Sequence, residues 1–179
     1  MHRIGLWIWA GAAMAAPAHS SVTATSDNGF ATQSSVEIVG DADAVYALLI
    51  MPARWWNGAH SYSGDAGNMQ MDARAGGCFC ETLPGPSGQA GSVEHGRVIY
   101  AAPGKRLRLS AALGPLQSEG VTGTLDFAII PVGKRVRVTM TYVVGGYLRS
   151  DPATMAPLVD TVLTDQLQGL KRAAERRVP

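Results

Sequence analysis

The residues best suited to chemistry lie in one predicted hairpin. Cys78 and Cys80 stand two apart in the first strand, and His95 lies in the second. If the chain turns near residues 85–88, Cys80 pairs with about Val93 and Cys78 with about His95. A histidine beside a thiol lowers the thiol pKa and makes a nucleophile. Two thiolates and an imidazole can also hold zinc and leave its fourth position open.

Other roles for the two cysteines stay open. Cysteine is often buried and packs as a small hydrophobic side chain, and a redox or disulfide role is a further alternative. A disulfide between Cys78 and Cys80 is expected to be strained, because they are only two residues apart. Packing is the leading interpretation, so the sequence predicts no metal and no cofactor.

Further polar candidates lie on the same strands. Glu81 and Glu94 are expected to face each other across the hairpin, as an acid–base pair or as solvated charges that Arg97 neutralises. Tyr100 and Tyr142 lie on strands that place their hydroxyls either in a cavity or at the sheet edge.

Two adjacent tryptophans are further candidates for a ligand site, and the motifs that the sequence lacks exclude several classes of enzyme. Trp55 and Trp56 follow a predicted short helix, and with Met51 they form either a cavity mouth or part of the core; at most one of the adjacent tryptophans is expected to enter the core. The sequence contains no H-E-x-x-H, G-x-S-x-G or C-x-x-C motif and no glycine-rich phosphate loop. A histidine-dependent mechanism must use His60 or His95, because the other two histidines precede residue 20.

The first twenty residues have the pattern of a secretory signal peptide. His2 and Arg3 precede an apolar run over residues 4–16, and small residues follow. Cleavage is expected after Ala18 or Ser20, which places the protein in the periplasm or outside the cell. The run is too short for a membrane anchor, so no membrane span is expected after cleavage.

Charge and composition exclude several classes of protein. The chain has 15 basic and 14 acidic residues. Loss of Arg3 leaves 14 of each sign, so the mature chain has no net charge and no cationic face for nucleic acid. With 46% hydrophobic and 16% charged residues, the chain is globular rather than disordered.

The elements that position these residues follow from periodicity. We expect residues 1–20 to be the signal peptide, 21–31 to be a flexible leader composed mainly of Ser, Thr, Asn, Asp and Gly, and 32–176 to form one domain. A strand ending at Val39 precedes a short helix capped by Asp41 and a second short segment after Pro52. Alternating residues then predict strands at about 69–73, 77–83, 91–101, 106–113, 120–130 and 135–145. From Asp151 onward, apolar residues at helical spacing predict a helix of about 24 residues.

The order of elements and several motifs resemble the SRPBCC superfamily of START-like, helix-grip proteins. The chain is similar to the branch of polyketide cyclase-like proteins and relatives of an activator of the heat-shock-protein ATPase. The matching motifs are residues 37–46, Trp55-Trp56, residues 75–81, 93–98, 103–107 and 114–116, and the terminal helix with Val159-Asp160 and Gln166. The resemblance implies an α+β fold in which a curved antiparallel sheet of six to seven strands wraps around the C-terminal helix, with a ligand cavity between them.

The resemblance leads to three functional expectations. The first is an exported binding protein for a small hydrophobic ligand. The second is a cyclase- or dehydratase-like enzyme acting in the same cavity, and the third is an envelope interaction domain with a filled interior. Whether the protein is an enzyme, and its oligomeric state, stay open. The expected ligand-binding residues are Trp55, Trp56, Cys80, Glu81, His95, Tyr100, Tyr142 and Gln166.

Overall fold

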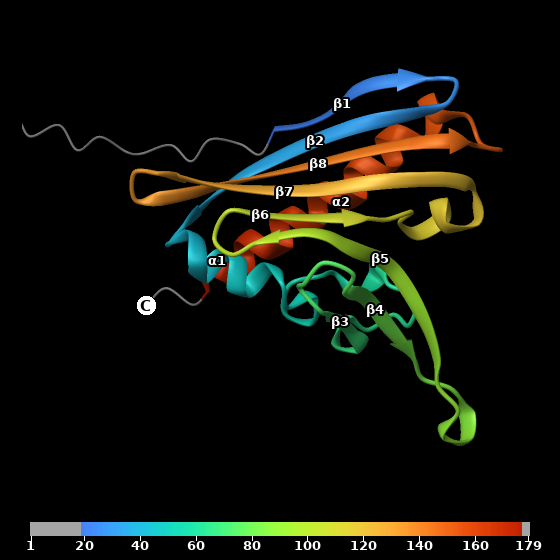
Figure 1. Ribbon diagram of the computed structural model, residues 1–179, viewed down its shortest axis with the longest axis horizontal. Coiled ribbons are helices and arrows are strands. Elements are labelled where there is room, and N and C mark those ends of the chain that lie inside the picture. The colour runs from blue at the N-terminus through green and yellow to red at the C-terminus, as the bar shows by residue number, and fades with distance from the viewer. Residues whose placement is uncertain (1–18, 177–179) are drawn as a thin grey trace, which may run out of the picture.

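The computed structural model describes residues 19–176 as one eight-stranded antiparallel sheet packed on a long C-terminal helix (Figure 1). The strands follow the order β1-β2-β8-β7-β6-β5-β4-β3 across the sheet. This architecture confirms the predicted α+β helix-grip fold, and each of the six strands predicted between residues 69 and 145 is present. The elements are β1 (His19–Ser26), β2 (Gly29–Val39), α1 (Ala42–Leu49), β3 (Met69–Met71), β4 (Cys78–Leu83), β5 (Gly91–Ala102), β6 (Arg106–Ser110), β7 (Gly120–Val132), β8 (Arg135–Tyr147) and α2 (Pro152–Glu175).

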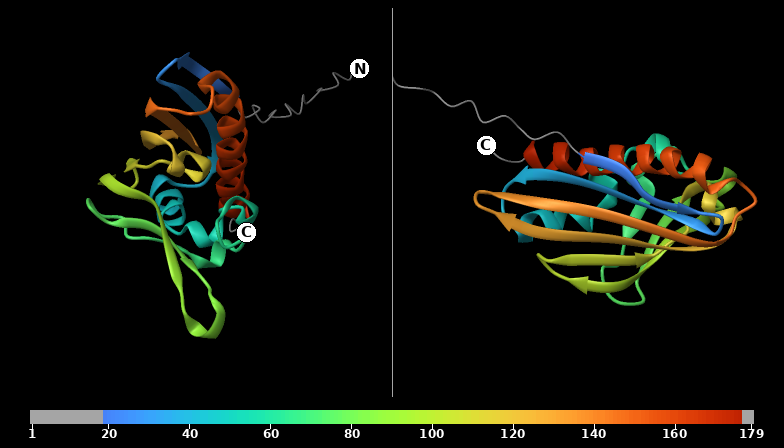
Figure 2. Two further views of the ribbon diagram at one scale, coloured as in Figure 1. Left: turned by 90° about the vertical axis from the view of Figure 1, so that its right-hand side faces the viewer. Right: turned by 90° about the horizontal axis from the view of Figure 1, so that it is seen from above.

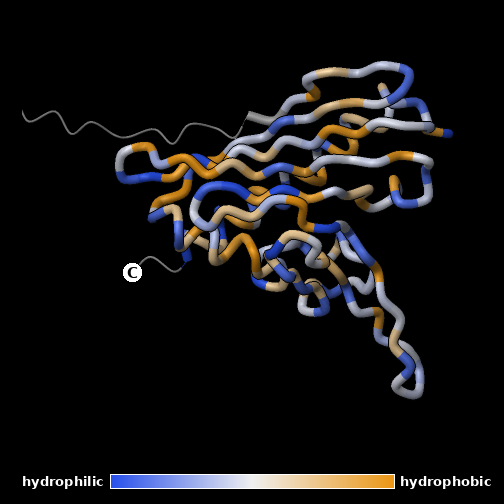
Figure 3. Tube along the Cα trace, in the orientation of Figure 1, coloured by the Kyte–Doolittle hydropathy of each residue, from blue (hydrophilic) through white to orange (hydrophobic). Residues whose placement is uncertain are grey.

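The inner face of the sheet holds the apolar residues that alternate along each strand. Side chains two apart share a face, and the apolar stretches recur along the central strands in Figure 3. The apolar residues that alternate along β6, β7 and β8 are all buried: Leu107, Leu109, Leu125, Phe127, Ile129, Val136, Val138, Met140 and Tyr142. The core therefore lies between this face and the helices, as the periodicity predicts.

Helix α2 begins where the sequence predicts, because Asp151 caps it by accepting hydrogen bonds from the N–H groups of Ala153 and Thr154. The sheet curves around this helix when seen edge-on (Figure 2). Small polar residues of β2 lie beneath it, and the hydroxyls of Ser34 and Thr164 are 2.7 Å apart. Near its C-terminal end, Lys171 donates to the Glu37 carbonyl at 2.6 Å. These bonds fix α2 across the sheet.

Residues 21–31 differ from the prediction of a flexible leader. They form most of β1 and the start of β2, and Asp27 and Asn28 form the turn between the two strands. Their Ser, Thr and Gly content indicates a loop, but strand formation here depends on pairing with distant residues. β2 pairs with β8 along its whole length, from Gly29 with Gly145 to Val39 with Arg135. β1 pairs with β2 in a hairpin and brings the sheet to eight strands, where six to seven are predicted.

The predicted signal peptide over residues 1–20 lies outside the described residues except for its last two, which begin β1. Within residues 19–176, no helix combines the length and apolarity needed to cross a membrane.

The segment that follows β2 forms the two short helical elements that the sequence predicts. Asp41 caps α1 by accepting from the Ala44 N–H at 2.8 Å. The predicted second segment is a short 3-10 helix, Pro52–Arg54. Similar single turns occur at Gly58–His60, Ala66–Asn68, Pro86–Gly88 and Gly114–Ser118.

Two β-bulges in β5 change which side chains face inward. One lies opposite Phe79 and Cys80, whose partners are Gly96 and Glu94, so that His95 is the extra residue. The second lies between Val98 and Tyr100. A bulge inserts one residue and interrupts strict alternation, so the faces that alternation predicts are wrong from the first bulge to the second, which restores the phase.

Candidate functional site

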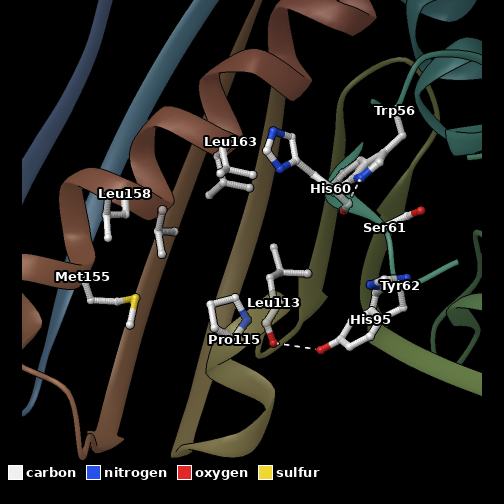
Figure 4. Close-up of a pocket in the computed structure, with 13 residues that line it drawn as sticks. Trp56, His60, Ser61, Tyr62, His95, Leu113, Pro115, Met155, Leu158 and Leu163 are labelled. Atoms are coloured by element: carbon white, nitrogen blue, oxygen red, sulfur yellow. Dashed lines mark hydrogen bonds between the residues drawn. The ribbon is translucent and has the colours of Figure 1, made fainter. Parts of the chain in front are cut away.

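A cavity of about 510 Å³ opens between the first half of α2 and the segments that face it. Helix α2 forms one wall, the segment around residue 60 forms the other, and a turn near residue 114 lies between them (Figure 4). The cavity size falls within the range of roughly 300–1,000 Å³ typical of small-molecule sites. Its lining residues are Trp56, His60, Ser61, Tyr62, His95, Leu113, Gly114, Pro115, Met155, Leu158, Val159, Val162 and Leu163.

The segment over residues 57–63 is tied to the protein at both ends. At its start, the Asn57 N–H donates to Gln166 Oε1 at 2.7 Å, and Asn57 Nδ2 donates to Asp165 Oδ2 at 2.8 Å. At its end, the N–H groups of Tyr62 and Ser63 donate to Glu81. The segment thereby bridges α2 and β4 and forms one wall of the cavity.

The turn over residues 113–115 is held from behind by Tyr142. The buried Tyr142 hydroxyl donates to the Ala111 carbonyl at 2.9 Å and accepts from the Leu113 N–H at 3.1 Å. Burial raises the pKa of Tyr142 to about 12, against a smaller opposing effect of the Leu113 hydrogen bond. On the cavity side, the Tyr62 hydroxyl donates to the Gly114 carbonyl at 2.9 Å. Tyr142 thus shapes the cavity without lining it.

A buried histidine–carboxylate pair lies at one end of the cavity. His95 Nε2 is 2.8 Å from Glu81 Oε2, and the residues are 3% and 1% exposed. Burial raises the pKa of Glu81. Hydrogen bonds from Ser63, the Tyr62 N–H and His95 outweigh that effect and lower the pKa to about 2. Glu81 is therefore an anion that fixes the position of the His95 ring.

Aromatic rings surround this pair. The centroid of the His95 ring lies 4.9 Å from that of Phe79 and 5.8 Å from that of Tyr62. Trp56 contacts Phe79 edge-on, with ring centroids 5.5 Å apart. The imidazole therefore has aromatic neighbours on the cavity side of β4 and β5.

The predicted cluster of Cys78, Cys80 and His95 does not form. The bulge in β5 pairs Cys78 with Arg97 and Cys80 with Glu94, rather than with His95 and Val93. Phe79 and Glu81 point into the core, so the cysteines between them belong to the opposite face. Their sulfurs are joined in a disulfide, with Cα atoms 5.5 Å apart. The interpretations of a His95-activated nucleophile and of a zinc site with His95 are therefore wrong for this arrangement.

The structure decides two further alternatives: Glu94 is a solvated charge paired with Arg97, and the placement of Tyr100 in the cavity is wrong. Glu94 lies on the outer side, where it pairs with Arg97, while Glu81 is buried. Tyr100 is 49% exposed beside Arg108, because the second bulge turns it away from the cavity. Neither an acid–base pair of two glutamates nor a Tyr100 hydroxyl in the cavity exists.

Of the predicted ligand-binding residues, Trp56 and His95 line the cavity. Trp55 is buried behind it and donates its indole N–H to the Leu49 carbonyl at 3.1 Å. Three predicted residues do not line the cavity but hydrogen-bond to segments that form it. Glu81 bonds to His95, Tyr142 bonds to Leu113, and Gln166 bonds to Asn57. Cys80 and Tyr100 belong to the other face.

Sequence reasoning missed most of the cavity wall. His60, Ser61 and Tyr62 lie in a segment without periodicity, and nothing local marks them as lining. The α2 residues were visible as a helical apolar stripe, but the stripe does not distinguish filled core from cavity. Leu158 belongs to the same apolar stripe, and only the structure shows that it is 60% exposed. Within residues 19–176, no group of three or more His, Cys, Asp or Glu side chains is placed to hold a metal ion.

Comparison with known proteins places the fold. A scan against protein-family models and a search of curated proteins give no match. Among solved structures, the di-domain ARO/CYC StfQ from the steffimycin biosynthetic pathway superposes with a TM-score of 0.58 and 13% identity, over 82% of this chain and 51% of StfQ. CalU16 from Micromonospora echinospora superposes with a TM-score of 0.55 and 12% sequence identity, over 88% of this chain and 85% of CalU16. An uncharacterized protein from Rhizobium leguminosarum superposes with a TM-score of 0.57 and 16% sequence identity, over 90% of this chain and 100% of that protein.

The fold and the cavity together define a helix-grip protein with a pocket between its sheet and its terminal helix. The solved structures with TM-scores of 0.55–0.58 share this fold, and identities of 12–16% limit the likeness to the fold.

Proposed function

We propose that this protein binds a small hydrophobic molecule in the pocket between α2 and the facing segments. The observation that carries the proposal is the cavity of about 510 Å³, whose walls are aliphatic on α2 and aromatic near His95. Pockets of this size with mainly apolar walls and a few polar groups are typical ligand sites. A completely filled interior, expected for a pure interaction domain, is not what the described residues form.

Filling the pocket is expected to abolish binding. Val162→Trp places an indole in the cavity, so the affinity for the neutral dye N-phenyl-1-naphthylamine should fall about tenfold or more, which corresponds to at least about 1.4 kcal/mol. Fluorescence titration measures the change. The free energy of unfolding, measured with urea, should change by less than about 1 kcal/mol, because the new ring occupies empty space.

The matched control is Thr161→Trp, which adds the same ring at the neighbouring, exposed position of α2. It should leave dye affinity at the wild-type value. Equal dye affinity in Val162→Trp and the wild type would place the dye elsewhere and reject the pocket as the binding site.

A second candidate function is acid–base catalysis in the same pocket, of the cyclase or dehydratase kind. The observation that favours it is the buried His95–Glu81 pair beside the cavity, since a histidine oriented by a carboxylate is a common general base. StfQ, which shares the fold, is described as an ARO/CYC protein. Liquid chromatography with mass spectrometry separates the two functions. A bound molecule recovered after incubation with both its mass and its retention time unchanged supports binding alone, whereas loss of water or a new retention time at the same mass supports catalysis.

We also propose that the chain is exported, on the signal-peptide pattern of its first twenty residues. Intact mass of protein purified from the cell envelope or medium should correspond to a chain starting at His19 or Ser21. Ala18 belongs to both candidate cleavage sites, so Ala18→Arg should leave the full precursor uncleaved. Retention of Met1 in wild-type protein from the cytoplasm would contradict export.

A further inference from the structure

The bond between His95 and Glu81 determines which nitrogen of His95 carries a proton. Glu81 accepts from the N–H groups of Tyr62 at 3.0 Å and Ser63 at 2.6 Å, and these bonds favour its ionised form. An ionised carboxylate only accepts hydrogen bonds. The 2.8 Å contact with Glu81 therefore requires that His95 Nε2 is the donor.

The other ring nitrogen is left for the pocket. Within residues 19–176, no hydrogen bond joins His95 Nδ1 to another protein group, and His95 lines the cavity although it is only 3% exposed. With the proton on Nε2, the neutral ring presents Nδ1 as a hydrogen-bond acceptor.

The remaining polar groups at the pocket are already bonded or hydrated. The Tyr62 hydroxyl donates to the Gly114 carbonyl, and the Ser61 hydroxyl donates to the Gly58 carbonyl at 2.9 Å. His60 is exposed to water, and in Figure 4 its ring lies toward Leu163, away from His95. Among the described residues, the ring nitrogen that the pocket leaves without a protein partner is thus His95 Nδ1, at the aromatic end, while Met155 and Leu158 form the opposite, aliphatic end.

We propose that the pocket selects an apolar molecule carrying a hydroxyl group, an alcohol or a phenol, whose O–H donates to His95 Nδ1. The inference rests on the proposed binding function and narrows the ligand class. Glu81 acts as a positioning residue, because it holds the His95 ring in the orientation and tautomer in which Nδ1 accepts a hydrogen bond from the ligand hydroxyl. The aromatic neighbours Phe79 and Tyr62 favour a planar group beside the hydroxyl.

Three matched probes test the selection: naphthalene, 1-naphthol and 1-methoxynaphthalene. The first measures apolar binding, and the methyl ether keeps the oxygen but removes the donor. Competition against the neutral dye at neutral pH should show 1-naphthol binding about 3- to 10-fold more tightly than the ether, the range expected for one neutral hydrogen bond.

Variants assign the preference to a residue. His95→Phe retains a planar ring without nitrogen, so it should bind 1-naphthol and 1-methoxynaphthalene with equal affinity. Tyr100→Phe, on the outer face, removes a hydroxyl of the same kind and should keep the preference. Loss of the preference in Tyr62→Phe but not in His95→Phe would assign the contact to the tyrosine and overturn the proposal.

A measurement on the wild-type protein guards against a variant that fails to fold. The ¹⁵N spectrum of the His95 ring should show a protonated Nε2 and an unprotonated Nδ1, and the Nδ1 signal should shift with 1-naphthol but not with the ether. A protonated Nδ1, or tighter binding of 1-naphthoate than of 1-naphthol, would indicate a cationic site and reject the proposal.

The outcomes separate the two levels of inference. If no probe and no dye binds, the proposed function fails and the ligand class fails with it. If all three naphthalenes bind equally and Val162→Trp blocks them, the binding function stands and only the hydroxyl selection is rejected.

Discussion

Glu81→Gln is expected to lower the free energy of unfolding by about 3 kcal/mol at neutral pH. The pKa of Glu81 falls from 4.5 to about 2 on folding, and each pKa unit is worth about 1.4 kcal/mol. Glutamine has one acceptor oxygen, whereas the carboxylate uses both of its oxygens to accept from Tyr62, Ser63 and His95. The amide N–H₂ must therefore face another donor in a buried site.

The stabilisation that ionised Glu81 contributes depends on pH in a defined direction. Because folding lowers the pKa of Glu81, its stabilisation is fully present above about pH 4.5 and is lost as the pH falls toward about 2. Urea unfolding between neutral pH and about pH 2.5 should show that loss in the wild type. In Glu81→Gln the same stretch of the curve should be flatter by about 3 kcal/mol.

The matched control is Glu94→Gln. Glu94 is a glutamate in the neighbouring strand, but it is exposed and paired with Arg97. Its replacement should change the stability by less than about 1 kcal/mol, as is usual for surface ion pairs. An acid-unfolding curve for Glu81→Gln that parallels the wild type would show that the buried carboxylate does not carry this stability.

Gly169→Ala is expected to destabilise the protein by about 2 kcal/mol, although alanine favours helices over glycine by about 1 kcal/mol. A Cβ at this position of α2 would lie 2.5 Å from the Trp55 carbonyl oxygen. That oxygen belongs to the backbone and cannot rotate away, so α2 must shift. Overpacking of this kind typically costs about 1–3 kcal/mol or more, which outweighs the gain in helix propensity.

Urea unfolding measures the effect, and Trp55 emission reports the displacement of the helix. Gly145→Ala is the control, because its Cβ would meet only the Asn28 carbonyl oxygen, at an ordinary 3.8 Å. A stability increase of about 1 kcal/mol in Gly169→Ala would mean that helix propensity dominates and that the contact with Trp55 is loose.

Much of the fold follows from the sequence because its signals are local. Alternation along residues 106–110 and 135–142 assigns the buried face correctly, and Asp41 and Asp151 mark both α-helix starts. β1 could not be found in the same way. Its composition is typical of a loop, and it is a strand because β2 and α2 provide a surface for it.

The candidate site was harder to predict because it depends on two inserted residues. Without the bulge at His95, alternation and register link the histidine to the cysteines; with it, His95 turns to Glu81. The bulge also requires Gly96, where a Cβ would lie 2.7 Å from that of Ala111. The second bulge removes Tyr100 from the cavity. Such register changes leave no periodic trace in the sequence.

The pairing of β2 with β8, and the packing of α2 on β2 and β1, also determine when the protein can fold. Ser34 and Thr164, which contact each other, are separated by 130 positions along the chain. Contacts between such distant residues form slowly, and domains dominated by them fold in about milliseconds to seconds. The pocket takes its walls from segments near residues 60, 114 and 158. A ribosome-bound chain that still lacks α2 therefore has no pocket, and a ligand can stabilise only the completed polypeptide.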